Sequence, residues 1–229
     1  MRYVPDAGAI FRSDWGLSAM LVFLVLAIFV AAPLSAIGVV SPVVLHAAFC
    51  LLFLSGVFAT FRRRAIGWLT TGLVIAAIAV RWTHAARPQP WLAIATEAFT
   101  IALLGTLTAI VLKQVFRAGP VTSHRIQGAI VVYLLIGLVW ASAYQLLDLL
   151  DPASFQVPAK ETGLHSQVLG YFSFVTLTTV GYGDITAVHP VARALVIAEA
   201  LIGQLYPAIL IARLVSLQLV SKTEKTPQP

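Results

Sequence analysis

Six apolar runs, separated by short polar or proline-containing segments, dominate the pattern of this chain. They lie at 17–37, 42–61, 65–82, 91–112, 127–147 and 190–215. A helix needs about 20 apolar residues to cross the hydrocarbon core of a bilayer, and each run reaches or approaches that length. The pattern therefore predicts six membrane-spanning helices.

A further apolar segment, too short to span, lies between the last two runs. Residues 148–164 are polar, whereas residues 166–177 are apolar. A short apolar stretch of this kind is typical of a re-entrant segment. Re-entrant backbone is tolerated at membrane depth only where it is buried in protein or lines a water-filled path. We therefore expect a re-entrant helix over 166–177.

The composition excludes the soluble classes of protein. Hydrophobic residues make up 59% of the 229 residues and charged residues 10%, against about 25% charged in soluble domains. The residues between the runs are too few for a separate soluble domain of about 100 residues. The single cysteine, Cys50, lies inside an apolar run and has no partner for a disulfide. With no nucleophile constellation, metal cluster or phosphate-binding motif, we expect no enzyme and no cofactor.

The basic residues predict the orientation in the membrane. Placing both termini in the cytoplasm puts eleven of them inside: Arg2, Arg12, Arg62, Arg63, Arg64, Lys113, Arg117, Arg125, Arg213, Lys222 and Lys225. Arg81, Arg87, Lys160 and Arg193 are then outside, which is the bias expected of a multi-pass protein of the cell membrane. Because these charges cluster at span ends, nucleic acid is not an expected partner. A signal peptide is the alternative for the first run, but its length favours a span.

The motif that indicates the function follows the re-entrant helix. It consists of Thr178, Thr179, Val180, Gly181, Tyr182, Gly183 and Asp184. This segment resembles the selectivity filter of potassium channels, in the context of a span, a re-entrant helix, the filter and another span. The chemistry agrees, because rings of backbone carbonyls can replace the water around K⁺. Aiming successive carbonyls at one axis needs residues at positive φ, which glycine at 181 and 183 adopts without a Cβ penalty.

The resemblance implies which atoms bind the ion. The carbonyls of Thr179, Val180, Gly181 and Tyr182, with the Thr179 hydroxyl, would form the K⁺ sites, and the side chains at 180 and 182 would turn outward. One chain supplies one loop and a ring needs four, so the resemblance implies a homotetramer with K⁺ as the permeant ion. Asp184 would add a negative field at the outer mouth.

Residues around the filter differ from the simplest two-span bacterial potassium channel. That channel has a glutamate four positions before the filter threonine, and here the position holds Val175. The carboxyl pair that braces the aspartate is therefore missing. Tyr171 stands where the family usually has tryptophan; either its hydroxyl reaches Asp184 or its ring packs behind the filter.

Glu199 is a carboxylate in the middle of the sixth run, where a charge is costly and indicates a function. We expect it behind the re-entrant helix, protonated or bonded to groups such as Ser173 or Thr176. A structural brace is favoured over a direct contact with the ion.

The sixth run resembles the inner helix of a channel. Gly203 falls at the usual glycine hinge, and Gln204, Pro207, Ile211 and Val215 share one helix face that would line the cavity and gate. Pro207 is expected to kink the helix. The alternative is an ordinary kinked span that packs against its neighbours and has no role in a pore.

The chain is therefore expected to be an all-α membrane protein with two parts. Residues 1–118 would form a four-span domain that resembles a voltage sensor in layout, 119–126 a linker, 127–216 the pore domain and 217–229 a short cytoplasmic tail. A sensor needs several basic residues along its fourth span, and residues 91–112 contain none. The expected function is passive, potassium-selective conduction in a lipid membrane without voltage gating. The alternatives are a modulatory or silent subunit that needs a partner, and a weakly selective cation channel.

Overall fold

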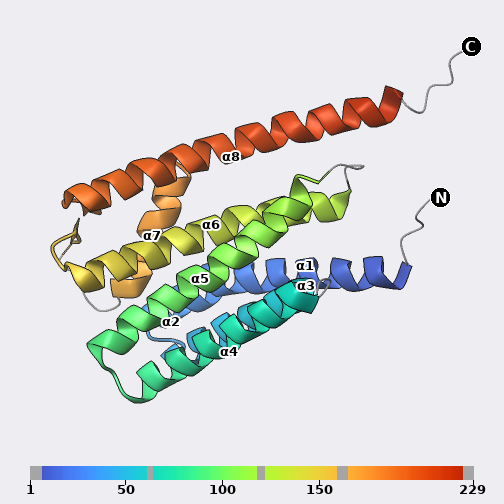
Figure 1. Cartoon of the computed structure of the whole chain (residues 1–229). Coiled ribbons are helices and arrows are strands. Elements are labelled where there is room, and N and C mark those ends of the chain that lie inside the picture. Colours follow the sequence, from blue (N-terminus) through green and yellow to red (C-terminus); the bar gives the residue numbers. More distant parts are fainter. Residues whose placement is uncertain (1–6, 61–63, 118–121, 159–164, 224–229) are drawn as a thin grey trace, which may run out of the picture.

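The computed structural model describes residues 7–60, 64–117, 122–158 and 165–223, and these are almost entirely helical (Figure 1). The elements in chain order are α1 (Ala7–Leu26), the π-helix η1 (Ala27–Ala31), α2 (Ala32–Ala36), α3 (Pro42–Thr60), α4 (Arg64–Ala86), α5 (Pro90–Val115), α6 (Ser123–Leu150), β1 (Phe155–Gln156), α7 (His165–Leu177), β2 (Thr186–Ala187) and α8 (Pro190–Thr223). The expected all-α class is confirmed.

Four helical stretches among the described residues are long and apolar enough to cross a membrane. They are Gly16–Ala36, Pro90–Val115, Ser123–Leu150 and Pro190–Leu217. The shorter apolar stretches are His46–Gly56, within α3, and Gln167–Leu177, within α7. Four of the six predicted spans are thereby supported, and α3 and α4 stay predicted spans.

The first span is one continuous run of α1, η1 and α2, interrupted only in its hydrogen-bond pattern. Pro33, near the start of α2, has no N–H to donate and its ring crowds the carbonyl four residues earlier. The five-residue π-helix directly before it widens the turn and accommodates this crowding. The span therefore continues through the proline to Ala36.

The first five long helices close into a bundle. α1 contacts α3 and α6, α4 contacts α3 and α5, and the most extensive contact of all joins α5 to α6 (Figure 1). The core consists of buried apolar side chains from all five helices, including Met20, Leu24, Phe53, Val74, Leu103, Leu107, Val132 and Leu135. The most extensive contact in the bundle therefore lies between α5, from the predicted four-span domain, and α6, from the predicted pore domain.

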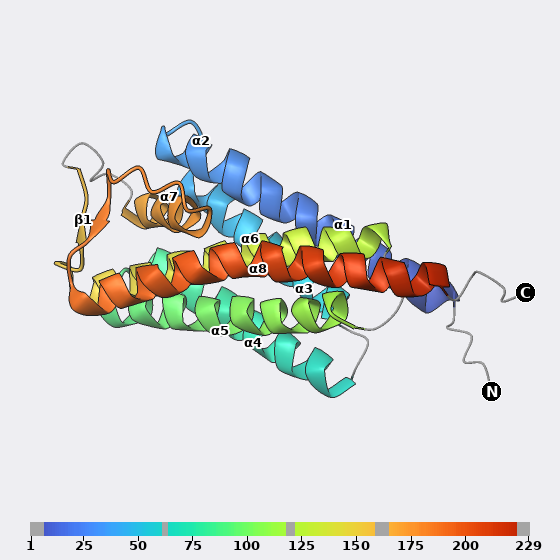
Figure 2. The same ribbon diagram turned by 90° about the horizontal axis from the view of Figure 1, so that it is seen from above.

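The short helix α7 lies beside α6 at the end of the molecule that carries β1 (Figure 2). It packs against both α6 and α8. A second core forms there around Tyr144, Leu169 and Phe172, with Phe155 and Ile185 from the segments on either side of α7. The antiparallel pair of β1 and β2 joins those two segments, so the region before α7 is tied to the region after residues 178–184.

Two glycines allow α7 to approach its neighbours. A Cβ on Gly203 of α8 would lie 1.9 Å from the backbone carbonyl oxygen of Leu177, at the end of α7. A Cβ on Gly137 of α6 would lie 2.5 Å from the ring of Phe174. Gly203 therefore sits at a backbone contact between two helices, a packing role that the expected hinge did not include.

Several boundaries differ from those expected. α6 begins at Ser123, inside the predicted linker, because the polar residues before the apolar run continue the helix. α8 extends to Thr223, into the predicted tail, since no glycine or proline interrupts the chain after Pro207 until Pro227. α8 is one continuous helix through Pro207 (Figure 1), and the expected kink stays a prediction.

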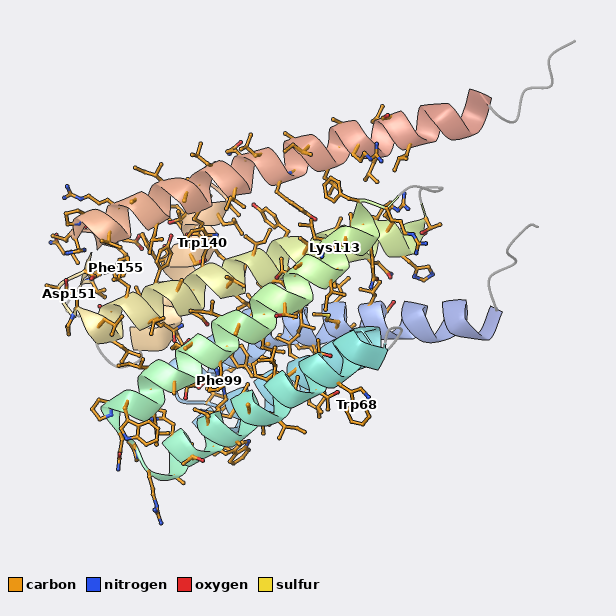
Figure 3. All side chains as sticks on the ribbon, viewed as in Figure 1. Trp68, Phe99, Lys113, Trp140, Asp151 and Phe155 are labelled. Carbon is orange, nitrogen blue, oxygen red and sulfur yellow. The ribbon has the colours of Figure 1, made fainter. Side chains whose placement is uncertain are left out.

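Some of the predictions concern positions outside the described residues. They include parts of the linker and the tail, and five of the charges used for orientation: Arg2, Arg62, Arg63, Lys160 and Lys225. The start of α1 and the end of α8 lie at the same end of the molecule in Figure 1. Lys113 lies toward that end and Asp151 at the opposite one (Figure 3).

Candidate ion pore

In the predicted filter segment, residues 178–184, the backbone dihedral φ is positive at every second residue from 179 to 183. Thr179, Gly181 and Gly183 have φ of 58°, 57° and 79°, and in the described part of the chain Gly38 is the other residue with positive φ. An L-residue in this region costs about 1–2 kcal/mol, so Thr179 must be held there by its surroundings. Such alternation turns successive carbonyl groups toward the same side.

Backbone hydrogen bonds fix the start of this segment to the last turn of α7. The N–H groups of Val180 and Gly181 donate to the carbonyl of Val175 at 3.0 and 3.4 Å. The N–H of Thr179 donates to the carbonyl of Thr176 at 2.9 Å. Val175 therefore holds the start of the predicted filter segment through its backbone carbonyl oxygen rather than through its side chain.

The side chains of the predicted filter segment are exposed in the single chain, and that of Thr179 also contacts α8. The amide Nε2 of Gln204 donates to the hydroxyl oxygen of Thr179 at 2.6 Å, which joins the inner end of the filter to α8. The side chains of Val180 and Tyr182 are 52% and 71% exposed in the single chain. At least half of each of these two side chains is therefore uncovered by the described part of its own chain.

Asp184 at the outer end of the filter is held by two donors. The hydroxyl of Tyr171 donates to Oδ2 at 2.8 Å, and the backbone N–H of Ile185 donates to Oδ1 at 3.0 Å. The first of the two alternatives for Tyr171, a bond to Asp184, is therefore present. These two bonds fix the carboxylate directly after the predicted filter segment, and its negative field at an outer mouth stays a prediction.

Replacing Tyr171 with phenylalanine is expected to destabilise the conducting filter without unfolding the protein. The change removes one donor to an exposed carboxylate, a loss of about 1 kcal/mol, or roughly fivefold in the population of the conducting state. The decay of K⁺ current in planar bilayers measures this. Tyr171→Trp keeps an N–H donor and should behave more like the wild type. Unchanged decay in Tyr171→Phe would argue against the role.

Glu199 is fully buried behind α7, as its sequence position suggested. Oε1 lies 2.5 Å from the hydroxyl of Ser173, and the hydroxyl of Tyr144 donates to Oε2. The expected contact with Ser173 is present. Thr176, on α7 like Ser173, is also buried, but the structure shows no hydrogen bond from it to Glu199. Tyr144 was not foreseen, because it lies 55 residues away along the chain.

The face of α8 that was assigned to a cavity is largely uncovered by its own chain. Gln204, Ile211 and Val215 are exposed, and Pro207 is half-buried. The phenol of Tyr206 faces the other way and donates to the carbonyl of Ala129 of α6 at 2.8 Å. Lining of a cavity and a gate by this face stays a prediction.

Sequence reasoning missed a second carboxylate within an apolar run. Glu97 of α5 interacts with Arg81 of α4 and with the hydroxyl of Ser142 of α6. The guanidinium of Arg81 also lies 4.7 Å from the ring centre of Phe49 of α3. The signal was the same as for Glu199, a carboxylate among apolar residues, and it indicates a polar contact that joins α4, α5 and α6 within the bundle.

Comparison with known proteins identifies similar sequences. Residues 161–218 match a family model described as ion channel. Protein LctB of Bacillus caldotenax is 30% identical over 118 residues, covering 49% of this chain and 87% of that protein. Protein LctB of Geobacillus stearothermophilus is 32% identical over 126 residues, covering 50% and 93% respectively. No solved structure matches the chain.

Proposed function

This chain belongs to the family of the LctB proteins and carries an ion channel domain, and we propose that four copies of it form a potassium-selective channel. Each copy contributes one filter segment to a ring around a common axis. K⁺ then passes down its electrochemical gradient through rings of carbonyl oxygens from residues 179–182.

The observation that carries the proposal is the positive φ of Thr179, Gly181 and Gly183. A loop that merely connects two helices has no need for left-handed backbone at every second residue, least of all at a threonine. A ring of ion ligands does need it, because each carbonyl must face the same axis. The Thr179 hydroxyl adds a further oxygen at the inner end.

The exposed apolar surface supports assembly into a homotetramer. The α8 side chains of Ile197, Leu201 and Ile211 are more than half exposed in the single chain, as are Val180 and Tyr182 of the filter. Contacts with neighbouring copies would cover these side chains and place the uncovered face of α8 on the central path. Lipid would surround the outside of the ring.

We propose six crossings for each copy, with α3 and α4 as the second and third. Their 19 and 23 residues correspond to about 28 and 34 Å of helix, close to the hydrocarbon thickness of about 30 Å. The start of α1 and the end of α8 lie at one end of the molecule, which an even number of crossings requires. The distribution of Lys and Arg supports a cytoplasmic position for that end.

The proposed channel has little intrinsic voltage dependence. A charge moved across the membrane contributes about 2.3 kcal/mol per 100 mV, so steep gating needs several charges in the field. The helix α5 stands fourth among the long helices, where a voltage sensor carries its charges. It has a single basic residue, Lys113, in its last turn. Lys113 lies toward the end where α1 starts and α8 ends (Figure 3).

The test is the flux of K⁺ and Na⁺ through purified protein in liposomes, with and without an imposed potential. We expect K⁺ flux to exceed Na⁺ flux by at least about a hundredfold, at similar rates under both conditions. Comparable K⁺ and Na⁺ fluxes would indicate a weakly selective cation channel and contradict the proposal. A tetramer without flux would favour a modulatory subunit that conducts only with a partner.

A further inference from the structure

Three helices meet at a buried cluster of polar side chains behind the pore helix. Tyr144 comes from α6, Ser173 from α7 and Glu199 from α8, and none of the three side chains has any exposed surface. The Ser173 hydroxyl lies 2.5 Å from Oε1 of Glu199 and 2.8 Å from the backbone carbonyl of Gly137 on α6. The Tyr144 hydroxyl donates to the other carboxyl oxygen.

A count of protons shows which form of Glu199 fits these contacts. A serine hydroxyl has one proton, and a backbone carbonyl has none. If Glu199 were ionised, the one proton of Ser173 would have to serve two acceptors, and one of the two short oxygen–oxygen contacts would lack a proton. If Glu199 is a neutral acid, it donates to Ser173, and Ser173 donates its own proton to Gly137. Every contact is then a normal hydrogen bond.

The surroundings of Glu199 agree with this count. Among the described residues, its partners in the structure are the two hydroxyl groups, and no Lys, Arg or His contacts it. An ionised carboxylate without a cation is costly at membrane depth, where neither water nor an opposite charge compensates it. A neutral acid satisfied by one donor and one acceptor is far less costly.

We infer that Glu199 carries its own proton and forms the centre of a directed hydrogen-bond chain, from Tyr144 through Glu199 and Ser173 to the carbonyl of Gly137. These hydrogen bonds fix α7 between α6 and α8. Ser173 lies five residues before the predicted filter begins at Thr178. Tyr144, Ser173 and Glu199 are thus positioning residues for the filter. Their effect on conduction rests on the proposed channel function, whereas the position of the proton does not.

The first test compares Glu199→Gln with Glu199→Ala. A glutamine amide donates to Ser173 and its carbonyl accepts from Tyr144, so it reproduces the neutral acid in shape and in hydrogen bonding. We expect K⁺ flux within about twofold of wild type for the glutamine variant and a loss of at least about tenfold for the alanine variant. Equal losses in the two variants would overturn the inference, because glutamine does not replace an ionised carboxylate.

The second test reads the proton directly by infrared spectroscopy of the purified protein in lipid. The spectrum of wild type minus Glu199→Gln should contain the carbonyl band of a protonated carboxylic acid, and Ser173→Ala should shift that band upward because the acid loses its acceptor. Glu97→Gln, which removes the carboxylate of α5, is the control that leaves the band in place. A carboxylate band assigned to Glu199 instead would overturn the inference. The band is read whether or not the protein conducts, so its presence without K⁺ flux would contradict the proposed function alone.

Discussion

Replacing Gly181 with alanine is expected to abolish K⁺ flux while the four subunits remain assembled. Gly181 has φ of 57°, where an L-residue costs about 1–2 kcal/mol, and the change is repeated in every copy of the ring. An added Cβ meets no atom of its own chain within 4 Å, so the fold tolerates it. The loss therefore arises in the filter backbone, which leaves the left-handed region and turns its carbonyls off the axis. Liposome flux and the size of the purified complex measure the two outcomes.

The control for this variant is Gly105→Ala. Gly105 lies within α5, has open space around its Cβ position and has no positive φ. Alanine favours a helix more than glycine does, so this variant should assemble and conduct like wild type. Normal K⁺ flux in Gly181→Ala would exclude the segment 178–184 as the filter.

Replacing Gly203 with alanine is expected to prevent stable assembly. The added Cβ would lie 1.9 Å from the carbonyl oxygen of Leu177, a backbone atom that has no rotamer to change. α7 and α8 must then move apart, at the upper end of the about 1–3 kcal/mol typical of overpacking in each subunit. The hydroxyl of Tyr133, which donates to the same carbonyl at 3.2 Å, would be displaced as well. The fraction of intact complex after graded heating measures the effect.

Gly137→Ala is a matched comparison on the opposite side of α7. Its Cβ would lie 2.5 Å from an atom of the Phe174 ring, and a ring can rotate away whereas a backbone carbonyl does not. We therefore expect a smaller loss of intact complex than for Gly203→Ala. Equal stability of the two variants would contradict the backbone contact between α7 and α8.

The parts of the site that could be predicted from the sequence depend on short stretches of chain. The sequence predicts a re-entrant helix over 166–177, and the helix α7 runs from His165 to Leu177. The agreement is close because apolar content and length determine such a segment locally. The bond between Tyr171 and Asp184 joins residues only 13 positions apart on either side of one motif. The first prediction rests on the composition of one short segment, and the second rests on the spacing of two residues around one motif.

The parts that could not be predicted depend on the register of helices distant in sequence. Tyr144 reaches Glu199 because a particular turn of α6 faces a particular turn of α8, and hydropathy does not encode that register. The same holds for Gly203, whose position resembled a hinge but whose contact lies on α7. Residue type marked Glu199 as unusual, but only the packing of three helices identifies its partners.

The packing of α5 against α6 of the same chain has a consequence for cooperativity. Lipid, a bound molecule or tension in the bilayer could displace the helices α1 to α5. Such a displacement would act first on α6 of the same subunit. If the copies of the proposed tetramer meet only along the central ring of filters and inner helices, neighbouring subunits would sense the displacement only there. Each quarter of such a channel would therefore receive its stimulus independently, and any concerted opening would originate along the ion path rather than at the periphery.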